Sequence, residues 1–143
     1  MSTNQICERR IRQTTRPKIR LDKGIAVVLH GPTGSGKMRI AESLASKETW
    51  AIIEGKDFSS KFVLGEILTL EPKTLVIDGW RFTPENTGKV KTLLSEKTVT
   101  VERKHKDLIV VNSPKHVIIC TADENAVNLC QEDRRFRLVS LSR

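Results

Sequence analysis

The sequence predicts an α/β protein with a mainly parallel five-stranded sheet, flanked by helices on both faces, and an inserted basic β-hairpin. Short apolar runs alternate along the chain with segments in which apolar residues recur at helical spacing. The run at 25–30 (IAVVLH) is apolar almost throughout, which is typical of a parallel strand buried on both faces. Strands that alternate with helices favour a parallel sheet between two helical layers.

The predicted elements follow one another from residue 25. After the first strand, a helix is expected over four residues at helical spacing, Ile40, Ala41, Leu44 and Ala45. Further strands are expected at 49–55 (TWAIIEG), 74–78 (TLVID), 116–121 (HVIICT) and 136–141 (FRLVSL). The remaining helices are expected at 59–68, at 123–130, and from the cap Thr83 and Pro84 to about Ser95.

The segment 98–112 breaks this alternation. TVTVER (98–103) and DLIVVN (107–112) have strand character and flank the basic tripeptide KHK, so the segment predicts a β-hairpin. Its tip carries Arg103, Lys104, His105 and Lys106. A preformed cationic tip can contact the phosphates of a nucleic acid at a small cost in conformational entropy. A merely solvated turn is the alternative.

The segment GPTGSGK at 31–37 has the pattern of a phosphate-binding loop, G-x-x-x-x-G-K-[ST], up to its last position. It follows a predicted buried strand and precedes a predicted helix, as such a loop requires. Glycines let backbone N–H groups turn toward phosphate oxygens, and Lys37 can neutralise the β- and γ-phosphates. Met38 stands where a hydroxyl would hold Mg²⁺. The expected nucleotide-binding residues are Gly31, Pro32, Thr33, Gly34, Ser35, Gly36, Lys37 and Met38.

Polar and charged residues also end or precede other predicted strands. Asp78 ends the strand at 74–78, where an acid can hold Mg²⁺ or its water; a capping role is the alternative. Asp123 follows the strand at 116–121, at the sheet edge where ligands bind in open α/β folds. Arg134 and Arg135 precede the last strand. Either arginine can stabilise a neighbour's γ-phosphate, or pair with an adjacent acid on the surface.

The charge of the chain favours polyanionic partners. The 143 residues carry a formal net charge of +8. Residues 1–24 hold seven Lys or Arg against two acids and are expected to form a basic arm. This arm would either bind nucleic acid, or form a helix within an oligomer, or remain a solvated tail. Residues 25–143 are expected to form one domain. Aromatic residues make up 4% of the chain, so platforms for base stacking are scarce.

Two further expectations concern the environment of the protein. No apolar run approaches the roughly 20 residues of a membrane span, and the first residues lack the apolar core of a signal peptide. The protein is therefore expected inside the cell, in the cytoplasm or a host nucleus, with no membrane partner. Cys7, Cys120 and Cys130 are far apart and are expected to be reduced thiols, with Cys120 buried.

Five segments together resemble the superfamily 3 helicases, the AAA+ motor domains of replication initiators from small DNA viruses, plasmids and some RNA viruses. The resemblance covers residues 25–143 and depends on the order and spacing of GPTGSGK, TLVIDGW, VKTLLSEKTVTVERKHK, HVIICTADEN and DRRF. It is strongest to the replication proteins of circular single-stranded DNA viruses. It implies a P-loop NTPase fold of the AAA+ kind that binds ATP and Mg²⁺. It also implies a ring, usually a hexamer, that acts on single-stranded DNA or RNA through a hairpin tip, here Lys104 and His105.

The resemblance implies roles for five further residues. Lys37 would contact the triphosphate, and Asp78 would be the metal-side acid. Asp123 would stand at the position of the family's polar sensor, and Arg134 or Arg135 would be an arginine finger acting in trans.

Three substitutions depart from the family pattern. Met38 replaces the hydroxyl, Gly79 replaces a second acid, and Asp123 replaces an Asn and adds negative charge near the γ-phosphate. Residues 1–24 are also too few for the nicking endonuclease domain that often precedes such a motor. A non-hydrolysing nucleotide- and nucleic-acid-binding protein is therefore the main alternative. A small-molecule kinase shares the phosphate loop but leaves the basic hairpin unexplained.

Overall fold

Residues 19–142 are described in the computed structural model of this chain. Five parallel strands form one sheet in the order β2-β3-β6-β1-β7. The strands are β1 (Ala26–His30), β2 (Trp50–Glu54), β3 (Thr74–Asp78), β6 (His116–Thr121) and β7 (Phe136–Ser140). The central strands β1, β3 and β6 are buried over nearly their whole length, because their apolar residues face a covered layer on each side. The predicted five-stranded parallel sheet is confirmed.

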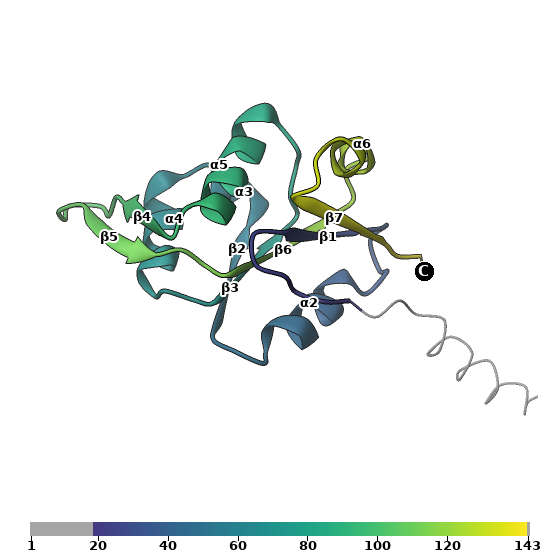
Figure 1. Cartoon of the computed structure of the whole chain (residues 1–143), viewed down its shortest axis with the longest axis horizontal. Helices are drawn as coiled ribbons and strands as arrows, with labels where there is room; N and C mark the ends of the chain where they lie inside the picture. Colours follow the sequence, from purple (N-terminus) through teal and green to yellow (C-terminus); the bar gives the residue numbers. More distant parts are fainter. Residues whose placement is uncertain (1–18, 143) are drawn as a thin grey trace, which may run out of the picture.

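Helices cover both faces of the sheet, but unequally (Figure 1). On one face, α2 (Lys37–Ala45) packs with Ile19 and Leu21 against Val27, Leu29 and the neighbouring strands. The other face carries α4, α5 and α6 over a larger apolar core that includes Val28, Ile77 and Ile119. The helices on that side are α3 (Gly55–Phe58), α4 (Lys61–Thr69), α5 (Pro84–Ser95) and α6 (Asn125–Glu132).

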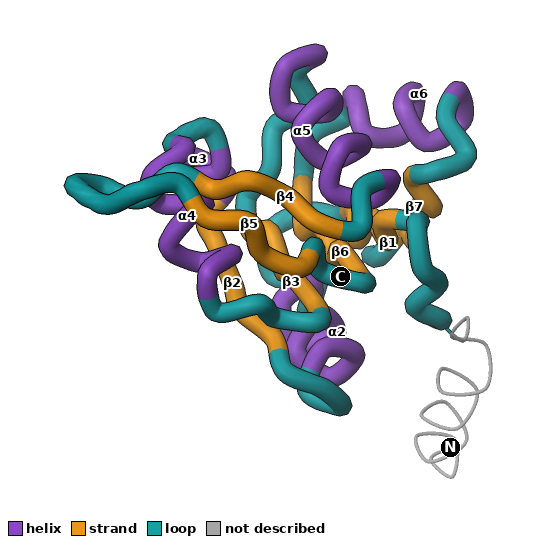
Figure 2. Tube along the Cα trace, turned by 60° about the vertical axis from the view of Figure 1, so that its left-hand side comes forward, coloured by secondary structure: helices purple, strands orange, loops and turns teal. Residues whose placement is uncertain are grey.

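The segment between α5 and β6 forms the predicted antiparallel hairpin, β4 (Thr98–Val101) and β5 (Ile109–Asn112). Val101 and Val111 are buried in the larger core, so one face of the hairpin packs on the domain. Figure 2 shows the hairpin beside α4, with its tip projecting away from the main sheet. One face of the hairpin is thus anchored on the core, while the tip extends beyond it (Figure 2).

Most element boundaries agree with the sequence prediction. The strands β3 and β6 match it to the residue, and α5 begins after Thr83, whose hydroxyl accepts a hydrogen bond from the Asn86 backbone N–H at 3.1 Å. The short helix α3 was not predicted. The helices expected at 59–68 and 123–130 begin two residues later, because Ser60 caps α4 and Asp123 is held in a turn before α6.

Part of the expected basic arm belongs to the domain. Ile19 and Leu21 pack on the α2 face, and Asp22 accepts a hydrogen bond from the Arg137 guanidinium at 2.7 Å. The rest of the expected arm, residues 1–18, and Cys7 within it, lie outside the described residues. Cys120 and Cys130 are free thiols, and Cys120 is buried, as predicted. Within residues 19–142 there is no helix with the length and apolar character needed to cross a membrane.

Candidate functional site

The phosphate-loop segment connects β1 to α2 at the carboxyl edge of the sheet. Gly34 and Gly36 both have φ 86°, in the left-handed region that favours glycine. Gly31 is buried, and a Cβ there would lie 2.7 Å from the Leu141 carbonyl oxygen, so a larger residue would displace the loop. The glycines of the sequence pattern are therefore required by the backbone conformation of the loop.

Lys37 is the first residue of α2, and its side chain folds back over the loop. Its Nζ donates hydrogen bonds to the Gly31 carbonyl at 2.6 Å and to the Pro32 carbonyl at 3.0 Å. An ammonium group has three donors, so one remains for a ligand above the loop. Ser35 Oγ is buried beside the loop without a hydrogen-bond partner among the described residues. A positive charge and an unsatisfied hydroxyl at a helix amino end suit a bound phosphate.

A cleft of about 1150 Å³ opens above this loop. Residues 33–38 line one side of it, and Asp78, Gly79 and Thr121 line another, so the cleft joins the loop to the ends of β3 and β6. Asp78 is exposed at the end of β3. Burial, and then the nearby Asp78 carboxylate, raise the pKa of the Cys120 thiol to about 12, so this thiol in the cleft wall stays protonated. The structure thus brings Lys37 and Asp78 to one cavity.

Met38 contributes to the cleft and to the core at once. Its half-buried side chain packs on the cluster that contains Val27 and Leu29, and it also lines the cleft. A thioether is a poor ligand for Mg²⁺, which prefers oxygen. Among the residues that line the cleft, Asp78 is the one with a carboxylate, the group best suited to Mg²⁺. The donor set therefore fits a cation held by Asp78, water and phosphate oxygens, without a helix hydroxyl.

Gly79 occupies the position of the second acid in the family pattern. Its φ is 75°, and its backbone N–H donates to the Cys120 carbonyl at 2.9 Å. A Cβ on Gly55, the first residue of α3, would collide with the Gly79 carbonyl. The chain therefore turns sharply at Gly79 and packs closely on α3, in a conformation that strains any residue with a side chain.

Asp123 faces a different depression from the one above the phosphate loop. Its carboxylate accepts hydrogen bonds from the Phe82 backbone N–H at 2.9 Å and from the Asn125 backbone N–H at 3.0 Å. Its own N–H donates to Thr121 Oγ1, which in turn donates to the Trp80 carbonyl. Asp123 thus ties the loop after β3 to the end of β6, and its expected role as a sensor stays a prediction.

Arg134 and Arg135 lie at the opposite edge of the sheet from the cleft. The strand β7 begins at Phe136, which is paired with Ala26 at the amino end of β1. The phosphate loop follows the other end of β1, about 17 Å away for a five-residue strand. Arg135 forms an ion pair with Asp133 at 3.1 Å, whereas Arg134 is exposed and makes no hydrogen bond or ion pair with residues 19–142.

The basic tip of the hairpin lies apart from the cleft. The turn is closed by a hydrogen bond from the Lys106 N–H to the Arg103 carbonyl at 3.2 Å, and His105 has φ 60°. Lys104, His105 and Lys106 are exposed, while Arg103 is half-buried and donates to the Asp107 carbonyl at 3.4 Å. The tip therefore exposes three of the four predicted side chains to solvent.

The sequence analysis missed an apolar wall of the cleft. It is formed by Ile19, Ile40 and Leu44, with Ser43 beside them. The helical spacing of Ile40 and Leu44 indicated a buried helix face, but no pattern placed Ile19 against it. This wall extends the cleft beyond the phosphate loop.

Comparisons with known proteins identify the fold but no family. No protein-family model and no curated protein matches this chain. Among solved structures it is similar to the C-terminal region of NrS-1, in two structures with a TM-score of 0.60 and 16% and 15% identity. These matches cover 85% of this chain and 30% of the NrS-1 chain.

A second similarity is to the JCV helicase in a complex with a small acetamide compound, with a TM-score of 0.51 and 18% identity. It covers 85% of this chain and 37% of the helicase chain, so this chain spans about a third of the length of the solved chains it matches. At these identities the similarity concerns the fold, which is helicase-like.

Proposed function

We propose that this chain is the nucleotide-binding core of a superfamily 3 helicase-like ATPase of the AAA+ kind, which acts on single-stranded DNA or RNA in viral or plasmid genome replication. The observation that carries the proposal is the phosphate loop facing Asp78 across one cleft at the carboxyl edge of a parallel sheet. ATP would lie with its phosphates over the backbone N–H groups of the loop and near Lys37. Mg²⁺, held by Asp78, water and the nucleotide, would offset phosphate charge.

The sheet topology supports this placement of the ligand. The connection that leaves β1 runs through α2 on one face of the sheet, whereas the connection that leaves the neighbouring β6 runs through α6 on the other face. A crevice opens at the carboxyl ends of two adjacent strands whose connections diverge in this way, and ligands of open α/β sheets bind there.

The arginines support an oligomer, because neither can reach the cleft of its own chain. Arg134 and Arg135 lie beside the amino end of β1, at the far edge from the phosphate loop. An arginine in this place can stabilise a γ-phosphate only on a neighbouring subunit, as in a ring with its sites between subunits. Arg134 is the better candidate, because Arg135 is already paired with Asp133.

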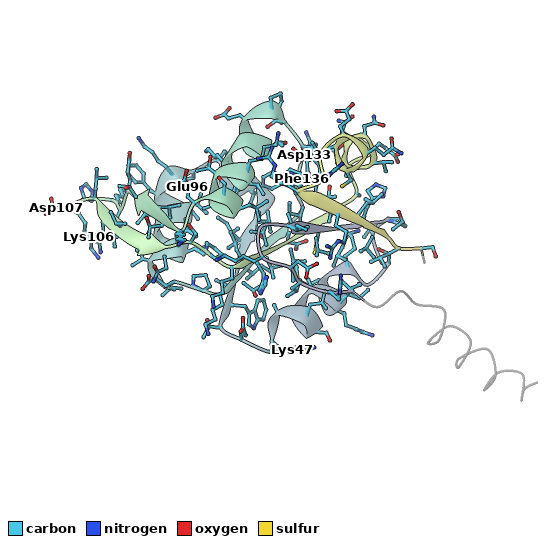
Figure 3. All side chains as sticks on the ribbon, viewed as in Figure 1. Lys47, Glu96, Lys106, Asp107, Asp133 and Phe136 are labelled. Atoms are coloured by element: carbon cyan, nitrogen blue, oxygen red, sulfur yellow. The ribbon has the colours of Figure 1, made fainter. Side chains whose placement is uncertain are left out.

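Nucleotide binding by the Lys37→Ala variant tests the proposal. Removing the ammonium should weaken ATP binding about tenfold or more, because a charge-assisted hydrogen bond contributes about 1.5–3 kcal/mol. Titration calorimetry with Mg²⁺-ATP measures this, and phosphate release measures any turnover. Lys47→Ala is the matched control, since Lys47 is exposed just beyond α2 (Figure 3) and is not among the residues that line the cleft. Equal affinity of a folded Lys37→Ala protein and its parent would reject the site.

A non-hydrolysing binding protein is the second candidate, favoured by Met38 and by Gly79, whose positive φ disfavours an acid at that position. In this case the loop and Lys37 would still hold a nucleotide, while the cleft would lack both the hydroxyl and the second acid. Steady-state ATP hydrolysis with and without single strands separates the two candidates. Turnover that depends on Lys37 supports the motor, and nucleotide binding without turnover supports the binding protein.

A further inference from the structure

A second basic site lies at the base of the hairpin, in a depression of about 300 Å³. Four lysines from four separate segments line it: Lys23, Lys73, Lys97 and Lys115. Lys73 and Lys115 directly precede β3 and β6, and Lys23 lies in the turn before β1, so the depression lies at the amino edge of the main sheet, opposite the cleft. Lys97 precedes β4 and belongs to the hairpin. None of the four forms an ion pair with a carboxylate of residues 19–142.

The depression has a net positive charge, and hydrogen bonds hold its hairpin side in place. Two acids also line it, Glu71 and Glu96, so four positive and two negative side chains leave a net charge of +2. The Glu71 carboxylate already accepts a hydrogen bond from the Asn112 N–H at 2.7 Å. The Ser113 N–H donates to the Lys97 carbonyl at 2.9 Å, which fixes the hairpin base. Ser113 Oγ is buried there without a partner among the described residues, and a ligand can satisfy it.

The outer face of the hairpin leads from this depression toward the tip. Two cross-strand pairs lie on the face that points away from the core, and all four of their residues are exposed. The pairs are Thr98 with Asn112 and Thr100 with Val110. Asn112 also lines the depression, so the two surfaces are continuous. Val110 is 65% exposed and Leu108, just beyond the strand, is 61% exposed. The middle of the outer face therefore exposes two apolar side chains beside Thr100, and the nearby acid Glu102 is paired with Lys61 at 3.0 Å.

The basic tip lies at the other end of this face. Figure 3 shows Lys106 and Asp107 at the far end of the hairpin and Glu96 near its base. Seven residues separate Lys97 from Lys104, which corresponds to about 23 Å of extended chain. That distance is spanned by on the order of seven stacked nucleotides, at 3.4 Å for each, or by fewer when the strand is extended.

We propose that the outer face of the hairpin is a binding track for one extended nucleic-acid strand. The tip and the lysine depression contact its phosphates at two places, and Leu108 and Val110 support its bases between them. The proposal depends on the nucleic-acid partner in the proposed function and adds a second, defined contact to it. A nucleic acid fits better than an acidic peptide, because compact ammonium groups at both ends suit regularly repeated phosphates, and an apolar middle suits bases.

Salt titrations of oligonucleotide binding to the full chain test the track. The patch variant replaces two lysines of the depression, Lys97→Gln with Lys115→Gln. The tip variant replaces two lysines of the hairpin tip, Lys104→Gln with Lys106→Gln. A control of equal charge loss elsewhere is Lys47→Gln with Lys56→Gln. Each lost phosphate contact lowers the slope of log K against log salt by about 0.7 for a single strand, so we expect the patch variant to lower it by about 1.4.

Oligonucleotide length and two further variants sharpen the test. Affinity of the parent for oligo-dT should rise as the strand grows from about 4 to about 12 nucleotides, and the patch variant should lose this gain. Lys97→Arg with Lys115→Arg should restore the slope, since the charge is kept. Val110→Glu should weaken binding of the longer strand with all lysines present.

Three outcomes overturn the track. A patch variant with the parent's slope and length dependence, beside a tip variant that loses affinity, rejects the track and leaves the proposed function standing. A parent that binds no oligonucleotide rejects both the track and the nucleic-acid partner, while nucleotide binding is judged separately through Lys37. Binding of polyglutamate, but not of oligo-dT, through Lys97 and Lys115 would assign the depression to an acidic protein.

Discussion

Replacing Met38 by Thr tests whether Mg²⁺ ligation limits turnover in the proposed ATPase. The threonine hydroxyl would add an oxygen ligand at the first turn of α2, next to the cleft that holds Asp78. We expect the rate of ATP hydrolysis to rise on the order of tenfold, which corresponds to about 1.4 kcal/mol of barrier. The nucleotide affinity should change much less, because Lys37 and the loop backbone are intact.

The same substitution should cost stability, because Met38 also packs on the core below α2. Full burial of a Met side chain contributes about 1.5–3 kcal/mol, so the half-buried Met38 contributes about 1 kcal/mol that Thr largely loses. Thr also has a lower helix propensity than Met, by a few tenths of a kcal/mol. The melting temperature should therefore fall by about 3–5 °C. Heating followed by circular dichroism measures this shift.

Met38→Leu is the matched control, since it keeps the apolar packing and adds no oxygen ligand. Phosphate release across a Mg²⁺ titration should show a higher rate and a lower Mg²⁺ requirement for Met38→Thr, and neither change for Met38→Leu. A folded Met38→Thr protein that binds ATP and hydrolyses it no faster than its parent would refute the reasoning. Gly79 would then be the remaining difference from the family, and its φ of 75° means that an acid there would cost about 1–2 kcal/mol in backbone strain.

Two further predictions concern the carboxylates that hold the domain together. The hydrogen bond from Arg135, and more weakly that from Lys91, holds the pKa of Asp133 well below its ordinary value of 3.8. The contribution of the ionised Asp133 to stability is therefore present above about pH 4 and is lost as the pH falls below it. In the Asp133→Asn variant, the unfolding free energy should fall less steeply between pH 4 and pH 2 than in the parent. Denaturant titrations of both proteins from pH 7 to pH 2 measure this, and parallel plots of unfolding free energy against pH would contradict it. Asp123→Asn leaves one acceptor oxygen where the carboxylate has two, so one of the two backbone N–H groups that it binds loses its partner. The unfolding free energy, measured in the same denaturant titrations at pH 7, should fall by about 1–2 kcal/mol. An unchanged value would show that the hydrogen bond to the Phe82 N–H is dispensable.

The sequence predicts the elements of this fold best where burial constrains both faces of a strand. The strands β3 and β6 were expected at their observed residues, because uninterrupted apolar runs between polar residues leave little freedom in the boundaries. The start of α5 was predicted from a different signal, the helix cap Thr83 followed by Pro84 at the first helical position. The meeting of Lys37 with Asp78 also followed from the sequence, because the carboxyl ends of parallel strands share one edge.

What the sequence did not predict depends on contacts between distant segments. The helix α3 has four residues, too few for a hydrophobic period, and its start at Gly55 requires the close approach of the turn at Gly79. The hydrogen bond from the Phe82 N–H to Asp123 joins residues 41 positions apart, and no local pattern distinguishes this carboxylate from one that faces a phosphate.

The lysines at the hairpin base show how charge can be misjudged from sequence alone. Lys73, Lys97 and Lys115 each stand singly in their segments, where a solvated side chain is the ordinary interpretation, and Lys23 belongs to the expected basic arm. Lys23, Lys73 and Lys115 precede β1, β3 and β6, however, and parallel strands bring their amino ends to one edge, while the base of the hairpin adds Lys97, so the fold gathers the four charges around one depression. The parallel topology that collects Lys37 and Asp78 at the carboxyl edge therefore also places three of these lysines at the amino edge, next to the base of the hairpin. In the functions proposed here, a nucleotide would bind at one edge of the sheet, and a nucleic-acid strand would run from the other edge along the hairpin to its basic tip.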